Sequence, residues 1–249
     1  MSHHIVEVED LHYTYPDGTA GLNGMSFRIL HGESVALVGA NGAGKSTLLL
    51  HLNGYLSPGR GKVRIGDHPL SPKNLKIIRR TVGMVFQDPD DQLFMPTVFD
   101  DVAFGPLNLG LAEKDVEEIV QKSLEIVGVA DLKKRPPYKL SGGEKRSVAI
   151  ATVLAMSPDI LVMDEPTASL DPRSRSRLIA LLKTFHHTKI IATHDLDMAM
   201  EMCERTIVLH QGKITADGPT LKIFQDETLL AQSGLEKPLK MQGCPICNP

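Results

Sequence analysis

The residues best suited to chemistry form a glycine-rich loop at positions 39–47, with the sequence Gly-Ala-Asn-Gly-Ala-Gly-Lys-Ser-Thr. An apolar run precedes this loop, and a segment typical of a helix follows it. Glycines allow successive backbone N–H groups to turn inward as an anion-binding nest, and the dipole of the following helix favours negative charge. We expect Lys45 to reach the β- and γ-phosphates of a nucleotide, and the Ser46 hydroxyl to complete a Mg²⁺ shell. The order of strand, glycine loop, Lys-Ser and helix therefore predicts a nucleotide site rather than a turn that merely starts a helix.

Two adjacent carboxylates, Asp164 and Glu165, follow an apolar run at 160–163 that is predicted to be a buried strand. The carboxyl ends of parallel strands are where doubly wound sheets bind ligands. Asp164 is therefore placed to hold Mg²⁺ through water, and Glu165 to orient or deprotonate an attacking water. An acidic helix start is the alternative, because the sequence Asp-Glu-Pro-Thr would also suit one.

Two further polar residues end apolar runs. His194 follows the run at 190–193, and Gln87 follows a predicted buried strand at 82–86. A lone His at a strand end is more often structural than catalytic. At the same rim as Lys45, however, a contact between His194 and the γ-phosphate is the better interpretation. The neutral amide of Gln87 can reach a metal ion or a water.

The spacing of apolar residues predicts an α/β fold. Strand-like runs at 5–8 and 25–30 have a turn and no helix between them, which indicates an antiparallel sheet. Apolar runs at 160–163 and 189–193 are separated by a helical segment, as in a parallel sheet covered on both faces. Between about 98 and 157 the apolar spacing is three to four, which is typical of helices. We predict a P-loop NTPase core with a mostly parallel sheet, an N-terminal antiparallel β subdomain and an inserted α-helical subdomain.

Composition narrows the possible partners. The 249 residues are 42% hydrophobic and 23% charged, as in a globular protein with a sizeable core. A net charge of −3, a pI near 6.4 and the absence of Trp argue against a nucleic-acid binder, which needs a basic face or stacking aromatics. The sequence has no apolar run long enough to span a bilayer and does not begin like a signal peptide. We therefore expect an intracellular chain with any membrane role supplied by partners.

The domain boundaries follow from these patterns. We place the main domain at 1–236, with the helical subdomain inserted at about 95–157, and a mobile tail at 237–249. The tail contains Pro and Gly without periodicity. It also carries Cys244 and Cys247, which offer two of the four thiolates of a structural zinc site. A loose, reduced tail is the other interpretation of this pair.

The motifs occur in the order found in ATP-binding cassette (ABC) transporter ATPases, and the resemblance covers residues 5 to about 224. The shared motifs are Walker A at 39–47, the Q-loop residue Gln87, the signature Leu-Ser-Gly-Gly-Glu at 140–144, Walker B at 161–166, the D-loop at 169–171 and the H-switch residue His194. The segments 86–94 and 100–106 resemble the energy-coupling-factor subfamily, which includes cobalt and nickel importer ATPases. Two residues depart from the family: Glu144 replaces the commoner Gln, and Ser147 stands where a basic residue is frequent.

The resemblance implies that two cassettes pack head to tail, with ATP held between the P-loop of one subunit and the signature of the other. It makes Tyr15 the aromatic that stacks on adenine, although spacing alone would make it an ordinary strand residue. The implied ATP-binding residues are Tyr15, Gly39, Asn41, Gly42, Gly44, Lys45, Ser46, Thr47, Ser141, Gly142, Gly143 and Asp171, the last at the dimer seam. The implied magnesium ligands are Ser46, Gln87 and Asp164, and the implied catalytic residues are Glu165, His194 and Gln87.

The resemblance also implies a role and a set of partners. The chain would be the ATP-hydrolysing subunit of an import complex at the cytoplasmic face of the cell membrane, with cobalt or nickel as the cargo. A second ABC ATPase subunit, identical or related, an integral membrane coupling subunit and a substrate-binding membrane subunit would complete the complex. Gln87 and the segment 90–92 would face the coupling subunit. Vitamin uptake and a soluble, non-transport ABC ATPase are the alternatives, whereas a plain kinase or GTPase would not account for the Ser-Gly-Gly segment.

Overall fold

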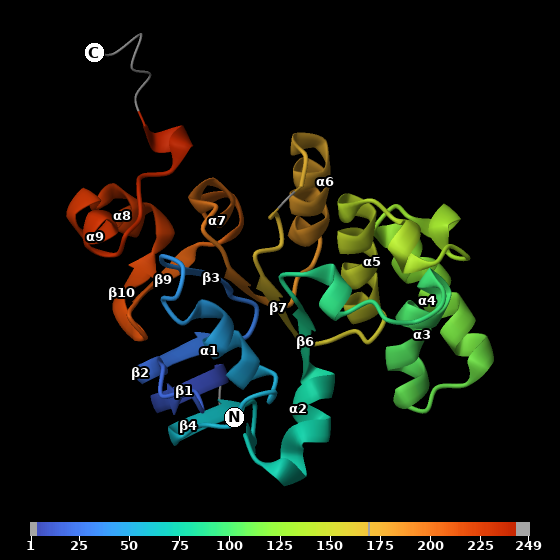
Figure 1. The fold of residues 1–249 in the computed structure, drawn as a ribbon, viewed down its shortest axis with the longest axis horizontal. Helices are drawn as coiled ribbons and strands as arrows, with labels where there is room; N and C mark the ends of the chain where they lie inside the picture. The colour runs from blue at the N-terminus through green and yellow to red at the C-terminus, as the bar shows by residue number, and fades with distance from the viewer. Residues whose placement is uncertain (1–3, 169, 243–249) are drawn as a thin grey trace. The chain divides into compact units, whose positions relative to one another are not determined.

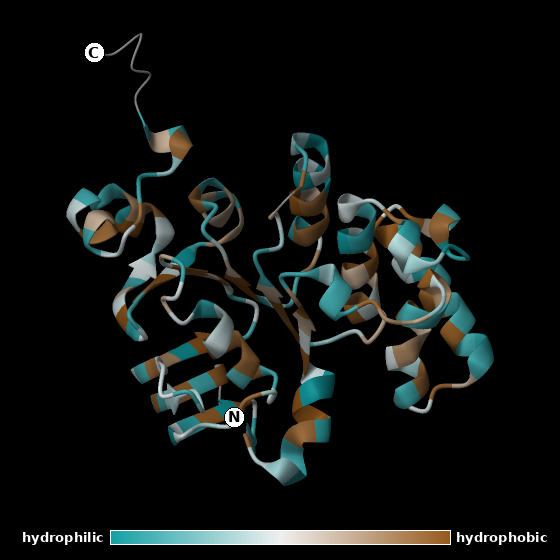
Figure 2. Ribbon diagram, in the orientation of Figure 1, coloured by the Kyte–Doolittle hydropathy of each residue, from teal (hydrophilic) through white to brown (hydrophobic). Residues whose placement is uncertain are grey.

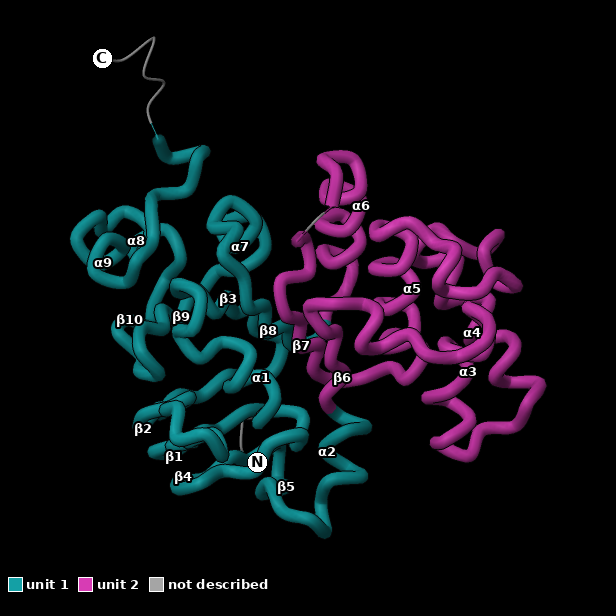
Figure 3. The backbone as a smooth tube through the Cα atoms, in the orientation of Figure 1, with its two compact units in different colours: residues 1–81, 187–249 teal, residues 82–186 magenta. Residues whose placement is uncertain are grey.

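The computed structural model describes residues 4–168 and 170–242. The chain divides into two compact units, which Figure 3 distinguishes by colour. Unit 1 combines Met1–Thr81 with His187–Pro249, and unit 2 is Val82–His186. Unit 2 is therefore one continuous segment inserted into the sequence of unit 1, and the chain begins and ends in unit 1.

An antiparallel sheet forms the N-terminal part of unit 1, in the order β2-β1-β4-β5. In β2 the burial alternates over much of the strand, and Met25, Phe27 and Ile29 are its buried residues near the end. This alternation is what a strand with one face on a core requires, and the predicted antiparallel β subdomain is confirmed. The strands are β1 (His4–Thr14), β2 (Ala20–Leu30), β4 (Arg60–Ile65) and β5 (His68–Pro69).

A second sheet in unit 1 has the strand order β10-β9-β3-β8. The central strand β3 pairs in parallel with β8 and with β9, and β10 pairs with β9 as an antiparallel hairpin. Every residue of β8 is buried, and Figure 2 shows the hydrophobic colouring of β3 and β9. Continuous burial of this kind is typical of parallel strands that are covered on both faces. The strands are β3 (Ser34–Val38), β8 (Thr188–Ala192), β9 (Arg205–His210) and β10 (Lys213–Pro219).

Unit 2 combines a parallel strand pair with a group of helices (Figure 1). The strands β6 (Val82–Val85) and β7 (Ile160–Asp164) pair in parallel. Three of its helices share an apolar core, in which Val102 of α3, Val120 of α4 and Val148 of α5 are fully buried. The helices are α3 (Val98–Asn108), α4 (Glu113–Ile126), α5 (Gly142–Leu154) and α6 (Pro172–Lys183).

The shorter helices complete the fold. They are α1 (Lys45–Leu52), α2 (Leu75–Thr81), α7 (Leu196–Met202), α8 (Thr220–Gln225) and α9 (Glu227–Gln232), with 3-10 turns η1 (Pro72–Asn74), η2 (Pro89–Asp91), η3 (Ala130–Leu132), η4 (Pro137–Lys139) and η5 (Leu239–Met241). Over residues 4–168 and 170–242, no helix is long and apolar enough to cross a membrane. The domain limits of 1–236 and of 95–157 stay predictions; α3 to α5 run from 98 to 154.

The predicted tail begins with residues that pack on unit 1. The backbone N–H groups of Leu239 and Lys240 donate to the two carboxylate oxygens of Asp197, at 3.1 and 2.9 Å. The predicted mobility of this tail stays a prediction, and Cys244 and Cys247 lie outside the described residues.

Candidate nucleotide site

The glycine-rich loop lies between β3 and α1 in unit 1. Gly39 has a φ of 157° and Gly44 a φ of 103°. A Cβ atom at Gly39 would lie 2.3 Å from the carbonyl oxygen of Leu209, and one at Gly44 would lie 2.8 Å from that of Gly21. Only glycine permits these close approaches of backbone to backbone. The packing of the loop against β9 and β2 therefore requires glycine at both positions.

Helix α1 begins at this loop with its first N–H groups directed out of the helix. Gly44 is the N-cap residue, no side chain of the described residues caps the helix, and its first turn holds no acidic residue. The first N–H groups of a helix have no partner within the helix and carry a partial positive charge. The loop and the start of α1 therefore fit a phosphate group.

Lys45 is folded over the loop. Its side chain Nζ donates to the carbonyl oxygen of Gly39 at 2.7 Å and to that of Ala40 at 3.3 Å, and the residue is only 7% exposed. These contacts hold a positive charge against the loop. Ser46, the next residue, is exposed in the first turn of α1, so its hydroxyl is accessible.

An aromatic cluster joins the N-terminal sheet to α1 in unit 1. The hydroxyl oxygen of Tyr15 lies 2.8 Å from Oγ1 of Thr47, and Nδ1 of His51 donates to the carbonyl oxygen of Thr47 at 2.7 Å. The ring of Tyr13 stands edge-on to Tyr15, with centroids 5.0 Å apart, and edge-on to His51, with centroids 4.9 Å apart. The predicted adenine-binding residue Tyr15 is thus held by the last residue of the predicted P-loop.

His194 lies at the same sheet edge as the glycine-rich loop. Leu37 of β3 is paired with Ala192 of β8, and the N–H of Thr193 donates to the carbonyl oxygen of Leu37 at 3.0 Å. His194 and Gly39 therefore follow neighbouring parallel strands at their carboxyl ends. Within unit 1 the structure therefore places Tyr15 at the end of the glycine-rich loop and His194 after the strand next to the one that precedes the loop.

In unit 2, Gln87 and the two carboxylates also follow neighbouring strands. Val85 of β6 pairs with Met163 of β7, so Gln87 and Glu165 each lie two residues beyond this pair. Asp164 and Glu165 are only 4% and 5% exposed. Within this unit, the structure brings Gln87, Asp164 and Glu165 to one end of the strand pair.

The backbone at Glu165 shows that this residue is not at a helix start. Its φ of 46° lies in the left-handed region, which costs a non-glycine residue roughly 1–2 kcal/mol. Residues 166–168 form a turn, and the next helix, α6, begins only at Pro172. The alternative of an acidic helix start is therefore wrong. Backbone strain of this kind is common at functional sites, where it sets the direction of a side chain.

The signature segment forms the start of α5. Ser141 is the N-cap residue, and its Oγ accepts a hydrogen bond from the N–H of Glu144 at 3.4 Å. In return, Oε2 of Glu144 accepts from the N–H of Ser141 at 2.7 Å and from its hydroxyl at 2.8 Å. These bonds, led by the one from the Ser141 backbone, lower the pKa of the Glu144 carboxyl. The unusual Glu144 therefore serves as the second half of a capping box.

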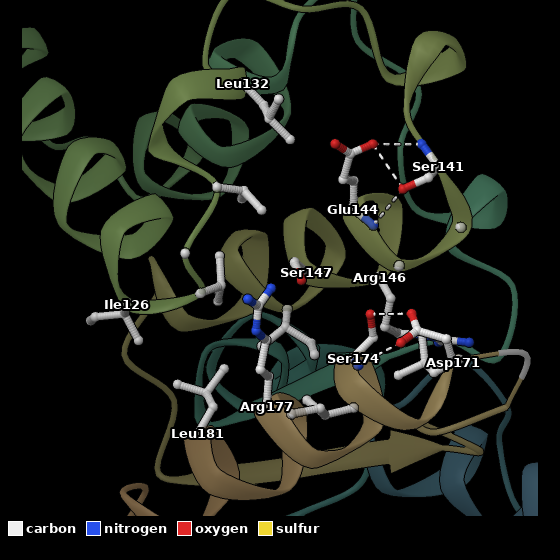
Figure 4. A pocket seen from close by; sticks show the side chains of 18 of the residues that line it. Ile126, Leu132, Ser141, Glu144, Arg146, Ser147, Asp171, Ser174, Arg177 and Leu181 are labelled. Carbon is white, nitrogen blue, oxygen red and sulfur yellow. Dashed lines mark hydrogen bonds between the residues drawn. The ribbon is translucent and has the colours of Figure 1, made fainter.

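A pocket of about 710 Å³ in unit 2 joins the signature to the predicted D-loop. Ser141, Gly142, Gly143 and Asp171 all line it. Asp171 caps α6, accepting from the N–H groups of Arg173 and Ser174 and from the hydroxyl of Ser174, and the hydroxyl bond is the main reason that its pKa is lowered. Figure 4 shows Ser147 and Arg177 on facing walls of this pocket.

The sequence did not single out Arg146 or His51. Both are buried, at 4% and 0% exposure. Arg146 donates to the carbonyl oxygens of Phe86 and Gln87, so it contacts the Q-loop from α5. A signal existed for Arg146, because it lies three and four residues before Ala149 and Ile150 on the apolar face of the helix.

Comparisons with known proteins agree with this architecture. The sequence profile of the ABC transporter family matches residues 22–168. A candidate ABC transporter ATP-binding protein of Geobacter sulfurreducens is 70% identical over 248 residues, with 100% of both chains covered. The energy-coupling factor transporter ATP-binding protein EcfA of Methanocaldococcus jannaschii is 48% identical over 240 residues, covering 94% of this chain and 86% of the relative.

Solved structures of ABC transporter ATP-binding proteins are also similar to this chain. The structure of cbiO1 from Clostridium perfringens, described as part of the ABC transporter complex cbiONQ, has a TM-score of 0.80 at 40% identity and covers 93% of this chain and 94% of its own. A dimeric ATP-binding cassette in a post-hydrolysis state, bound to ADP and Pi, has a TM-score of 0.79 at 28% identity, covering 86% of this chain and 98% of its own.

The chain therefore belongs to the ABC transporter family and is an ATP-binding cassette of that family. Within that family it is similar to the energy-coupling-factor ATP-binding proteins. The predicted fold class and the assignment as an ATPase subunit of a transporter are confirmed. The roles of the individual site residues stay predictions.

His51 provides a prediction about stability. Burial lowers the pKa of its ring from the ordinary 6.5, although hydrogen bonds with the backbone of Thr47 and Ser57 oppose the shift. The unfolded chain therefore binds this proton at a higher pH than the folded chain, so the free energy of unfolding should fall as the pH drops below about 6.5. In His51→Gln this contribution is absent, and urea denaturation at a series of pH values should show a shallower loss of stability in acid. Parallel curves for the two proteins would contradict the prediction.

Proposed function

We propose that this chain is the ATP-hydrolysing subunit of a membrane complex that imports a transition-metal ion, with cobalt or nickel as the cargo. The observation that carries the ATP site is the start of α1, which no side chain in the described part of the chain caps, with Lys45 held against the preceding loop. The cargo is inferred from the resemblance of 86–94 and 100–106 to the energy-coupling-factor ATPases. The 40% identity to cbiO1 over nearly the whole chain supports this choice.

In this proposal the phosphates of ATP contact the backbone N–H groups of the loop and the ammonium of Lys45, while adenine stacks on Tyr15. Hydrogen bonding to Thr47 holds Tyr15 for that contact. Ser46, Gln87 and Asp164 would hold Mg²⁺, because hydroxyl, amide and carboxylate oxygens are the ligands that this ion prefers. When bound, the ion neutralises charge on the phosphates.

The catalytic groups are Glu165, His194 and Gln87. Glu165 is a buried carboxylate directly after Asp164, and its left-handed backbone sets its direction. We assign it the task of orienting or deprotonating the attacking water. His194 would contact the γ-phosphate, and the amide of Gln87 would reach the metal ion or the water.

The site would be completed by a second cassette. The capping box leaves α5 starting with Gly142 and Gly143, whose backbone has no side chain to shield it. The start of a helix attracts phosphate. We therefore propose that Ser141, Gly142 and Gly143 contact ATP bound to the partner subunit, with Asp171 at the seam. The dimeric cassettes of known structure, similar over 86% of this chain, support this arrangement.

Membrane subunits would bind through the Q-loop segment, at the cytoplasmic face of the membrane. The segment η2 holds two acidic residues, of which Asp90 pairs with Lys145 at 2.5 Å. Exposed carboxylates beside Gln87 suit a partner with basic residues. Uptake of a vitamin by the same machinery is the second candidate, and the 48% identity to the energy-coupling factor transporter ATP-binding protein EcfA is compatible with either cargo.

The role of Glu165 is tested by Glu165→Gln, which preserves the size of the side chain and removes its charge. ATP binding should persist, while hydrolysis at saturating Mg-ATP should fall by about a hundredfold or more because the water is no longer activated. Phosphate release measures hydrolysis, and a fluorescent ATP analogue measures binding. Glu118→Gln, at an exposed position on α4, is the control. Near-normal turnover of Glu165→Gln would sink the assignment.

The shared site is tested by mixing two variants. Ser141→Arg should retain ATP binding but block closure of the dimer, and Lys45→Ala should lose binding. Neither variant alone should hydrolyse ATP. In their heterodimer one site combines both defects and the other has two wild-type halves, so hydrolysis should reappear on mixing. Undiminished hydrolysis by Ser141→Arg, diluted until it is monomeric, would refute a site shared between subunits.

The cargo is tested by uptake into cells that carry the complete transporter. Radiolabelled cobalt or nickel should accumulate with the wild-type ATPase and not with Glu165→Gln. Labelled vitamins are the comparison. Uptake of a vitamin, with no metal uptake above the Glu165→Gln background, would replace metal import by the second candidate.

A further inference from the structure

Arg146 connects the signature helix to the Q-loop inside unit 2. It lies in the second turn of α5, whose N-cap is Ser141. Its guanidinium donates to the carbonyl oxygen of Phe86 at 2.6 Å and to that of Gln87 at 2.5 Å. These carbonyls are 60 and 59 residues away in the sequence. The Arg146 side chain therefore holds the backbone of Gln87, whose side-chain amide is predicted to be catalytic, by hydrogen bonds.

A second side chain makes the reciprocal connection. Oε1 of Gln92 accepts from the N–H of Phe86 at 3.2 Å. Its Nε2 donates to the carbonyl oxygen of Ala149 and to Oγ1 of Thr152, both at 2.7 Å. Residues 86–92 and α5 are thus joined by bonds that run in both directions.

Because the Arg146 guanidinium is buried, it depends on its two hydrogen bonds to the Q-loop backbone. Burial lowers the pKa of its guanidinium, and the charges of Asp88 and Asp164 act against this shift. An arginine in a protein remains protonated even so. A buried cation without its hydrogen-bond acceptors is strongly destabilising, so separating α5 from the Q-loop backbone at this point would remove the two carbonyl acceptors of the buried guanidinium. The two segments are expected to move as one body.

We propose that Arg146 is a positioning residue that makes Gln87 and the Ser141 end of α5 respond together. Any partner or ligand that shifts Gln87 then shifts the signature by the same movement, and the reverse also holds. This proposal rests on the proposed function, in which Gln87 acts on one ATP and Ser141 on the ATP of the partner subunit. A single arginine would thus link the two sites of the dimer.

The test is a double-mutant cycle on hydrolysis. Arg146→Met retains an unbranched side chain and removes the hydrogen bonds, and it should lower kcat roughly tenfold while the affinity for a fluorescent ATP analogue stays within about twofold. In a Gln87→Ala background, which is already slow, Arg146→Met should cause less than about a twofold further loss, because its effect acts through Gln87. Independent, multiplicative losses would overturn the proposal.

A second readout does not depend on hydrolysis. Hydrogen exchange should become faster in Arg146→Met at residues 86–92 and at 141–145 together. Arg146→Lys, which retains the charge but not the paired donors, should give a smaller increase in both segments. Faster exchange in only one segment would overturn the proposal. If the wild-type chain hydrolysed no ATP, the proposed function would fail, and exchange would still decide the role of Arg146.

The matched control is Lys145→Met, on the neighbouring residue of the same helix. Lys145 contacts the side chain of Asp90, which is 62% exposed, rather than the backbone of the Q-loop. Although the Lys145 side chain is only 17% exposed, its partner carboxylate is open to solvent, which screens the ion pair and limits its contribution to stability. Lys145→Met should therefore leave hydrolysis within about twofold of wild type and exchange in both segments unchanged. A Lys145→Met variant as impaired as Arg146→Met would assign the effect to general loosening of α5 and overturn the specific role.

Discussion

Helix α1 begins at the glycine-rich loop, and no side chain among the described residues caps it. The arrangement of the strands and glycines around this loop in unit 1 depends on that helix start. A helix start that is to receive phosphate must leave its N–H groups available, and its backbone must come close to neighbouring strands. Gly39 and Gly44 meet the second condition, because a Cβ atom at either would clash with a carbonyl oxygen. The parallel pairing of β3 with β8 places the loop after β3 and His194 after β8 at the same end of the sheet.

Unit 2 also contains a helix that begins at glycines, but the start of this helix is stabilised differently. In this helix, α5, a capping box pairs the N–H groups of Ser141 and Glu144. Unit 2 contains two features that are energetically unfavourable by themselves, a buried arginine and a strained backbone at a buried glutamate. Arg146 compensates its burial with backbone carbonyls, and Glu165 adopts a left-handed backbone at the end of β7. Both features restrict how the Q-loop and Walker B residues can move, which suits groups that must respond to a nucleotide.

The family assignment and the physical description support each other at different levels. Membership in the ABC transporter family identifies an ATPase of a transporter, and the 70% identical relative spans the whole chain. In the proposed function, the cargo would be bound by other subunits, because this chain would act through nucleotide chemistry and mechanical coupling rather than through contact with the solute. The connection between Arg146 and the Q-loop is a candidate for that coupling, since it joins Gln87, which we propose acts on one ATP, to the helix whose start we propose contacts the ATP of the partner subunit.

Local sequence determined the classes of structure around the glycine-rich loop and predicted a nucleotide site there. The glycine loop, the carboxylates after an apolar strand and the Ser-x-x-Glu capping box each act through neighbours within a few residues, so their patterns are readable. Tertiary structure alone decided that Tyr15 pairs with Thr47, that Glu165 is left-handed rather than the start of a helix, and that Arg146 holds the backbone of Phe86 and Gln87. These contacts join residues tens of positions apart or depend on how the surrounding chain packs. No local pattern encodes which distant carbonyl a buried arginine will reach, because the packing of the whole unit selects it.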